Sequence, residues 1–310
     1  MHVEFVNFGS AHLAAALAVL GIPSGPFWLY FSATILLIIG LIKILKTELP
    51  QLHGLDKILP FGRLFFTIPL AVFGTEHFTN TADIAQIVPS WMPAHVFWVY
   101  FVGIGLIAAA LSITVEIQAP LAATLVGVMF FLFVLMMDIP GLMSELHNRF
   151  SWALALRETA FSGGGLAYAG SHWIKNGRRS MPWLVTVAKF FIAIPAVFYG
   201  VETFLHPANA PGVPLEKIMP VWIPARLAWA YLAGVVLFVT GLAVIINKKA
   251  QLAATYMGIM ILLLMLFVYL PFLVANPTDL EALNYFFDTL LFCGTIFVLA
   301  DALRERTSAG

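Results

Sequence analysis

The 310-residue chain is 61% hydrophobic and only 10% charged, with a mean hydropathy of +0.94. Soluble proteins carry roughly a quarter of their residues as charged side chains, so this composition excludes a soluble globular protein and indicates an integral membrane protein. Sixteen basic and sixteen acidic residues give a formal net charge of zero. No run of Lys or Arg stands out in the sequence, which excludes nucleic acid as a partner and leaves the lipid bilayer as the expected one.

Ten apolar segments follow one another along the chain, each close to the ~20 residues that a helix needs to cross a bilayer. They lie near 5–22, 26–44, 61–80, 94–115, 120–141, 154–173, 185–205, 225–247, 251–274 and 284–303. Pro and Gly occur freely within these segments, and the segments lack the alternation of barrel strands. We therefore predict an all-α, polytopic transmembrane protein with about ten spans.

The Lys and Arg residues predict how the chain is oriented in the membrane. If the ten spans alternate, twelve of these residues lie on the side that holds both termini and four lie on the other. Cytoplasmic loops carry the excess of basic residues in membrane proteins. The prediction is a multi-pass protein of the cell membrane, of the bacterial inner-membrane type, with cytoplasmic N- and C-termini.

Two halves of the chain repeat one pattern. Residues 68–78 (IPLAVFGTEHF) and 194–204 (IPAVFYGVETF) share Pro, Gly, Glu and Phe at one constant offset of 126 residues. Further along, WMPA at 91–94 matches WIPA at 222–225 at an offset of 131, and Glu158 matches Asp288 at an offset of 130. The pattern predicts two tandem four-helix units that differ in loop length.

The predicted division is an N-terminal transmembrane hairpin at 1–58, a first unit at 59–180 and a second unit at 181–310. Because each unit contains an even number of helices, both copies enter the membrane from the same side. Such parallel repeats are related by a pseudo-two-fold axis along the membrane normal.

Three motifs of the first unit resemble the DoxX/DoxD-like membrane family. They are GTEHF at 74–78, VPSWMP at 88–93 and FWVYF at 97–101. The resemblance implies two DoxX-like four-helix bundles. For some members of the family it also implies an association with quinone-linked sulfur oxidation or with membrane redox complexes. Quinone is then the expected small molecule, and a membrane or extracytoplasmic redox protein is the expected partner.

Ionisable residues of the predicted spans gather in one half of the bilayer. Glu76 lies thirteen residues after Arg63, about 20 Å along a helix, which places Glu76 in the outer half. Ionisable groups at membrane depth cost a few kcal/mol, about 2.5 to 3.5 on insertion scales, and are held there by partners or by function. The candidate ligand-binding residues are Glu76, His77, His95, Asp138, Glu158, Glu202, Arg226 and Asp288.

These residues permit several functions. Two carboxyl groups at similar depth, Glu76 with Glu158 or Glu202 with Asp288, would share one proton if they were close together. A shared proton suits exchange at a quinone head group, with His77 as a relay. Two alternatives stay open. One is a proton-coupled small-molecule transporter, and the other is a structural or assembly subunit in which the acids only hold helices together. The sequence assigns no enzyme activity and no catalytic residue.

Other polar motifs have simpler interpretations. A di-metal carboxylate bundle needs Glu-x-x-His on two helices, and the sequence lacks that motif, so no metal site is predicted. Trp91, Pro93, Trp222 and Pro224 belong to two Pro-x-Trp-x-Pro loops on the outer side. We expect these loops to anchor the chain at the membrane interface or to cap the polar residues below them.

Overall fold

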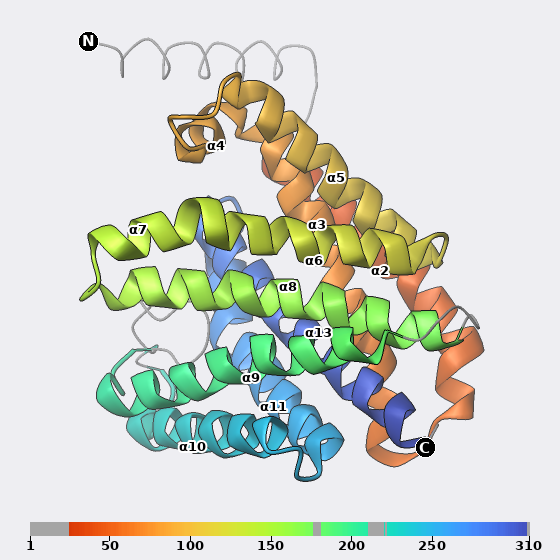
Figure 1. Cartoon of the computed structure of the whole chain (residues 1–310). Helices are drawn as coiled ribbons and strands as arrows, with labels where there is room; N and C mark the ends of the chain where they lie inside the picture. The colour runs from red at the N-terminus through yellow and green to blue at the C-terminus, as the bar shows by residue number, and fades with distance from the viewer. Residues whose placement is uncertain (1–24, 176–180, 210–219, 221, 309–310) are drawn as a thin grey trace.

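The computed structural model describes residues 25–175, 181–209, 220 and 222–308 (Figure 1). These residues form helices and no β-strand, which confirms the all-α prediction. The α-helices are α2 (Gly25–Lys43), α3 (Leu59–Thr79), α4 (Thr81–Ile87), α5 (His95–Val115), α6 (Ala119–Phe133), α7 (Ile139–Ser144), α8 (Arg149–Lys175), α9 (Pro182–Leu205), α10 (Arg226–Ile245), α11 (Ala250–Leu264), α12 (Leu270–Ala275) and α13 (Leu280–Ser308). Short π- and 3-10 helices join them: η1 (Ile44–Glu48), η2 (Leu49–Gln51), η3 (Gly54–Ile58), η4 (Val134–Asp138) and η5 (Met265–Tyr269).

Eight helical segments of the described chain are long and apolar enough to cross a membrane, which supports a polytopic membrane protein. They are 25–51, 54–79, 95–115, 119–144, 183–205, 226–245, 250–275 and 280–304. The predicted span at 5–22 lies outside the described residues. The predicted span at 154–173 lies within α8, which is not among the eight, because Arg157, Glu158 and three successive glycines make it more polar than its neighbours.

Secondary structure recurs along the chain at the offset of 131 residues. The helix α6, the π-helical turn η4 and the helix α7 match α11, η5 and α12 residue for residue. Pro140 and Pro271 lie at equivalent positions just after the two π-helical turns. Proline lacks the N–H group of a regular helical hydrogen bond and its ring displaces the preceding turn, which accounts for both turns.

The backbone conformation of the loops recurs as well. Six non-glycine residues of the described chain adopt left-handed φ angles between 48° and 61°. They form three pairs at the same offset, Ala94 with Ala225, Glu116 with Asn247 and Gln118 with Lys249. Because a left-handed φ is costly for residues with a Cβ atom, its recurrence at matched positions indicates that both copies impose the same loop geometry.

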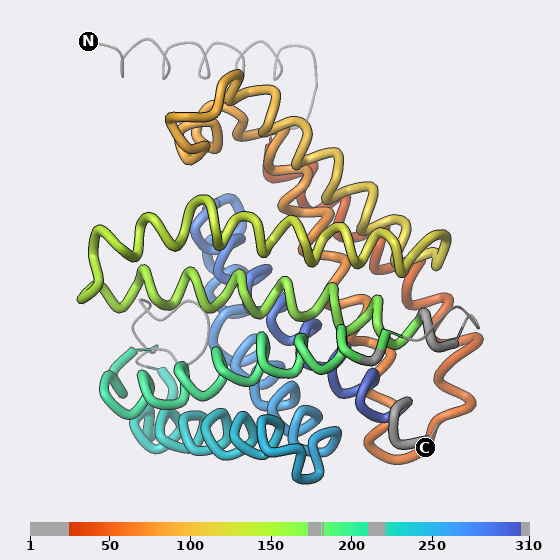
Figure 2. Tube along the Cα trace, in the orientation of Figure 1, coloured from red at the N-terminus to blue at the C-terminus, as the bar shows by residue number. Residues whose placement is uncertain are grey.

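The long helices form a closed ring of contacts. In order around the ring they are α3, α5, α6, α8, α9, α10, α11 and α13, and α13 closes the ring by packing along α3. The first helix of each repeat therefore packs along the last helix of the other: α3 along α13, and α9 along α8. The last helices, α8 and α13, also pack against each other across the middle of the molecule (Figure 2).

Small residues allow the central helices to approach closely. A Cβ atom added to Gly294 of α13 would lie 2.3 Å from the backbone nitrogen of Phe66 on α3. On α8, a Cβ atom at Gly165 would lie 2.5 Å from the carbonyl oxygen of Ala123 on α6. Membrane helices gain most of their association energy from such close packing, so these glycines fix how the ring closes.

The helix α2 packs against α3 and α5 on the outside of the ring. At one end, the Tyr30 hydroxyl donates a hydrogen bond to the Pro277 carbonyl oxygen over 2.8 Å. At the other end, Lys43 forms an ion pair with Glu116. The helix is therefore held at both ends by polar contacts with the two repeats.

The α3–α13 contact predicts that Gly294→Ala destabilises the protein. The new methyl group would overlap backbone atoms of α3, which cannot move aside as a flexible side chain can, and overpacking of this kind costs about 1 to 3 kcal/mol. Thermal unfolding of the purified protein measures the effect. Gly105→Ala on α5 is the matched control, since no atom lies within 4 Å of the added Cβ. Equal midpoints for both variants would contradict this account of the packing.

Candidate functional site

Arg157 of α8 lies at the centre of a cluster of ionisable side chains. Its Nη1 lies 2.6 Å from Oδ2 of Asp288 on α13, and its Nη2 lies 3.9 Å from Oε1 of Glu158. Asp138, the last residue of η4, is a further carboxylate whose charge interacts with Arg157. The side chains of Arg157, Glu158 and Asp288 are only 17%, 21% and 12% exposed. We refer to these four residues as the Arg157 cluster.

The two acids on α8 and α13 occupy equivalent positions in the repeats. Glu158 corresponds to Asp288 at the offset of 130 residues. Because α8 and α13 pack together in the middle of the ring, both copies of this acid lie beside one guanidinium. The second repeat carries Phe287 at the position of Arg157, so the duplicated chain builds one shared cluster with a single Arg.

The Arg157 cluster contains more acids than bases. It contains three carboxyl groups, two of them in contact with the guanidinium, and a buried charge without a partner is costly. A neutral cluster therefore requires two further positive charges, which bound protons can supply. Asp138 Oδ2, Glu158 Oε2 and Arg157 Nε are buried and have no hydrogen-bond partner among the described residues. The two carboxyl oxygens are available to bind protons, and Arg157 Nε, which keeps its proton, is available to donate a hydrogen bond.

Glu76 extends the cluster along α3. Its carboxyl group is 8% exposed and accepts a hydrogen bond of 3.4 Å from Asn284 Nδ2 on α13. Asp288, one helical turn further along α13, is its charged neighbour. Glu76 therefore meets the second repeat rather than Glu158 of its own repeat, because α3 packs along α13.

Glu202, the repeat equivalent of Glu76, lies in a different environment. Its Oε2 is 3.5 Å from Arg149 Nη1 on α8 and 3.7 Å from His206 Nε2. The sequence predicted pairs within each unit, Glu76 with Glu158 and Glu202 with Asp288. On the neighbouring long helices, Glu76 instead meets Asn284 and Glu202 meets Arg149, each in the other unit, because the first helix of each unit packs along the last helix of the other.

The other predicted site residues lie apart from these contacts. The Nδ1 atom of His77 is 2.7 Å from the Phe73 carbonyl oxygen of its own helix. His95 begins α5 and is half-buried, and Arg226 begins α10 and is exposed. None of these three forms a described contact with the Arg157 cluster in the part of the chain that the structure covers.

The two proline and tryptophan loops lie at the surface. The rings of Trp91 and Trp222 are 67% and 56% exposed, and Pro93 and Pro224 are exposed too. The Pro93 carbonyl oxygen accepts a hydrogen bond of 3.0 Å from the indole of Trp98, which fixes the first loop to α5. Exposed Trp rings at a helix boundary can insert into the membrane interface.

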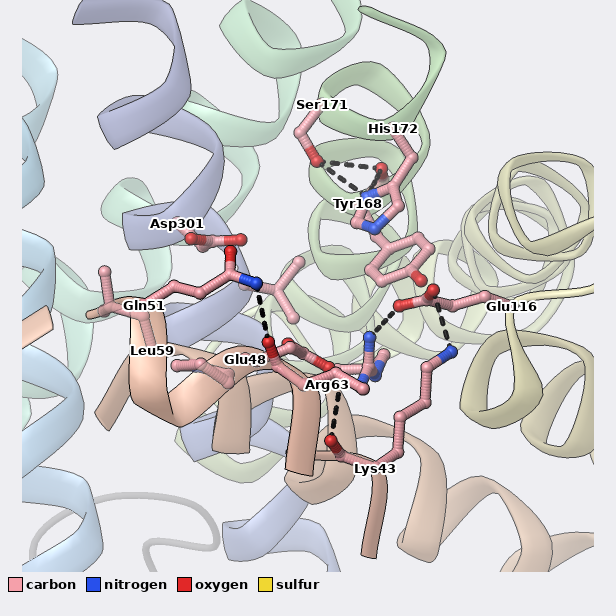
Figure 3. Close-up of a pocket in the computed structure, with 13 residues that line it drawn as sticks. Lys43, Glu48, Gln51, Leu59, Arg63, Glu116, Tyr168, Ser171, His172 and Asp301 are labelled. Atoms are coloured by element: carbon pink, nitrogen blue, oxygen red, sulfur yellow. Dashed lines mark hydrogen bonds and ion pairs between the residues drawn. The ribbon is translucent and has the colours of Figure 1, made fainter. Parts of the chain in front are cut away.

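A second polar site lies at the opposite ends of the same helices (Figure 3). It is a cavity of about 250 Å³, which we refer to as the Arg63 pocket. Its lining residues come from α2, α3, α8, α13 and the connections between helices: Lys43, Thr47, Glu48, Gln51, Leu59, Pro60, Arg63, Glu116, Tyr168, Ser171, His172, Val298 and Asp301.

Ion pairs form one side of the Arg63 pocket. Arg63 is 7% exposed, its Nη2 lies 2.5 Å from Glu48 Oε1, and its Nη1 donates to Glu116 Oε1. The other oxygen of Glu116 lies 2.8 Å from Lys43 Nζ. These contacts tie η1 and α2 to α3 and to the turn between α5 and α6.

Sequence reasoning missed the Arg63 pocket. It treated Lys43 and Arg63 only as basic residues that orient the chain in the membrane. The available signal was that Glu48 and Glu116 lie at the same predicted membrane boundary as the two cations. Carboxylates beside basic residues at one boundary predict ion pairs, although not which helices they join.

Comparison of the chain with protein-family models, curated proteins and solved structures finds no match. Within the described residues, no group of three or more His, Cys, Asp or Glu side chains is placed to hold a metal ion. The function must therefore be argued from the geometry of the two polar sites.

We predict that the substitution Arg157→Met greatly lowers the stability of the protein, because Arg157 is the only base of the Arg157 cluster. This variant leaves Asp288 and Glu158 without their buried counter-charge, and breaking a buried ion pair in this way costs about 3 to 5 kcal/mol. The double variant Arg157→Met with Asp288→Asn should recover part of the loss, because it also removes an unpaired carboxylate.

Thermal unfolding at neutral pH measures both changes. Lys248→Gln is the control, since an exposed Lys is expected to change stability by about 0.5 kcal/mol or less. An Arg157→Met variant as stable as this control would show that the cluster does not support the fold.

From the pKa of Glu116 we predict that low pH weakens the ion pairs at the Arg63 pocket. Burial raises the pKa of Glu116, but the hydrogen bond from Lys43 and the charges of Arg63 and Lys43 outweigh burial and leave this pKa below its ordinary value of 4.5. A lowered pKa in the folded state means that the stabilisation is fully present above about pH 4.5 and is lost as the pH falls through the lowered pKa.

Glu116→Gln should therefore lower the unfolding midpoint at neutral pH and have a smaller effect in acid. The measurement is the unfolding midpoint of wild type and variant as a function of pH. Glu145→Gln, at an exposed acid beyond α7, should change the midpoint little at any pH. A constant difference between Glu116→Gln and wild type down to acid pH would contradict the prediction.

Proposed function

We propose that this membrane protein binds and exchanges protons at the Arg157 cluster, and that it does so for a small amphiphile of the quinone type. The proposal rests on one observation: Glu158 and Asp288, acids at equivalent positions of the two repeats, lie beside one guanidinium and are enclosed by helices. The resemblance to DoxX-like proteins supports the choice of quinone, and a membrane redox protein would be its partner.

Proton exchange follows from the chemistry of the cluster. Three carboxyl groups beside one Arg can hold different numbers of protons, and each proton gained or lost changes the charge that the guanidinium must balance. Conversion of a quinone to a quinol consumes two electrons and two protons. In this proposal the redox partner supplies the electrons, and the carboxyl groups of Glu158, Asp288 and Asp138 supply the protons.

A proton-coupled transporter is the second candidate, and the positions of the two polar sites favour it. The Arg157 cluster and the Arg63 pocket lie near opposite ends of α8 and α13. The helices between the two sites bury Phe66, Phe161 and Phe292. Alternating-access carriers hold their substrate near the bilayer midplane, so in this candidate the apolar region between the two polar sites would have to open to the substrate.

Quinone binding with linked proton uptake tests the first candidate. Purified wild-type protein is titrated with decylubiquinone by calorimetry in two buffers that differ in ionisation enthalpy, so that the protons taken up on binding are counted. We expect Glu158→Gln and Asp288→Asn to reduce the proton count and to weaken binding about tenfold, a loss of about 1.4 kcal/mol. Glu202→Gln, which alters an acid beside Arg149 and His206, should bind as wild type does.

The outcomes separate the three functions. Binding that is unchanged in both cluster variants, with only lower unfolding midpoints, would leave a structural subunit and sink the proposal. Substrate uptake into liposomes that is driven by a pH gradient and lost in both cluster variants would identify a transporter instead.

A further inference from the structure

Helices α10 and α11 pack against each other (Figure 1), and a groove of about 360 Å³ lies between them, which we refer to as the α10–α11 groove. The groove faces outward from the ring, because its rim is formed by side chains that are 42% to 55% exposed: Val235, Val239, Tyr256 and Leu263. Its surface is entirely apolar, and the Thr240 hydroxyl beside it donates a hydrogen bond of 2.6 Å to the Val236 carbonyl oxygen of its own helix. In a bilayer such a groove can hold a hydrocarbon chain, but an apolar lining alone does not select which lipid.

Two cations at one end of the groove can make that selection. Lys248 and Lys249, in the turn between α10 and α11, are exposed, and their ammonium groups form no ion pair or hydrogen bond with the residues that the structure describes. They differ in this respect from Lys43 and Arg63, which are paired with Glu116. Neighbouring ammonium groups without carboxylate partners attract an anion from outside the chain, and lipid phosphates are the nearest anions at a membrane boundary.

The first repeat has no counterpart of these two charges. Its turn at 116–118 reads EIQ, whereas the equivalent turn at 247–249 reads NKK. Both turns hold their first and last residues at left-handed φ angles, 61° and 52° in the first repeat and 60° and 48° in the second. Because the same backbone forms without lysines in the first repeat, the lysines are not required for the shape of the turn. Their charge is therefore available for binding in the second repeat.

The lysines lie at the distance from the groove that one phospholipid spans. The lining residues nearest the turn are Thr240, five residues before the end of α10, and Tyr256, six residues after the start of α11. These intervals correspond to about 8 to 9 Å of helix. The headgroup region of a bilayer is about 5 to 8 Å thick on each side of the hydrocarbon core. A phosphate at the lysines therefore places the acyl chains of the same lipid at the level of the groove.

We propose that the α10–α11 groove binds an anionic phospholipid, with one acyl chain in the groove and the phosphate at Lys248 and Lys249. Basic residues beside membrane helices bind anionic headgroups in this way. Tyr256 lies at the end of the groove nearest the lysines, and a Tyr ring with its polar tip suits the ester region between phosphate and acyl chain. The site shares no residue with the Arg157 cluster, so it goes beyond the proton exchange proposed above and does not depend on it.

The lipid dependence of the stability of the full-length protein tests the proposal. The unfolding midpoint is measured in nanodiscs of phosphatidylcholine that contain increasing fractions of phosphatidylglycerol. We expect phosphatidylglycerol to raise the midpoint of wild type in a saturable manner. The double variant Lys248→Gln with Lys249→Gln should have the wild-type midpoint in pure phosphatidylcholine, because both side chains are exposed. It should need about tenfold more phosphatidylglycerol for the same rise, because it has lost both charges that attract the phosphate.

Further comparisons separate this site from a general attraction of anionic lipid to basic residues. Lys46→Gln with Lys57→Gln removes the same charge from exposed positions outside the groove and should respond to phosphatidylglycerol as wild type does. Val239→Trp keeps both lysines but fills the groove from its rim, so it should lose the response, whereas Val128→Trp, at an exposed position on α6, should keep it. Glycerol phosphate, which has the phosphate but no acyl chain, should not raise the midpoint.

The proposal is overturned if phosphatidylglycerol stabilises wild type no more than phosphatidylcholine does, if both lysine double variants respond alike, or if Val239→Trp responds as wild type does. Stabilisation by glycerol phosphate alone would also overturn it, because the groove would then have no part in binding. Glu158→Gln, which alters the Arg157 cluster, should keep the full response to phosphatidylglycerol. Failure of lipid binding is therefore distinguishable from failure of proton exchange.

Discussion

The contact between α8 and α13 is the constraint on which the rest of the structure depends. It places Glu158 and Asp288 beside Arg157 and thereby joins the two repeats through a buried ionic contact. Glycines of these helices let α3 approach α13 and let α6 approach α8 closely. Because the last helix of each repeat also packs along the first helix of the other, neither repeat encloses its polar residues alone.

Fusion of the repeats allows an asymmetry that an assembly of identical chains could not have. In a symmetric dimer of one repeat, Arg157 would face its own copy near the axis, and two buried guanidinium groups would repel each other. Within one chain the second position is Phe287, and Asp138 is likewise replaced by Tyr269. The Arg63 pocket shows the same divergence, because Tyr168 corresponds to Val298. The Arg63 pocket combines unlike residues from equivalent positions, whereas the Arg157 cluster combines two equivalent acids with an Arg that has no equivalent.

The two polar sites share their supporting helices. Glu158 and Asp288 lie on α8 and α13, and the same helices provide Tyr168 and Asp301 to the Arg63 pocket. The buried phenylalanines between the sites keep this middle region apolar.

The sequence alone determined the class of the protein, its helical spans and its internal repeat, because each is encoded in local composition or in matches between distant segments. The positions of Glu76, Asp138, Glu158 and Asp288 along their predicted helices indicated that these acids lie in one half of the bilayer. Only the tertiary structure decided their partners, since hydropathy and helix length fix where a residue lies along a helix but not which helix it faces. For that reason the pairing of Glu76 across repeats, the shared Arg157 and the pocket beside Arg63 emerged only when the ring of helices closed.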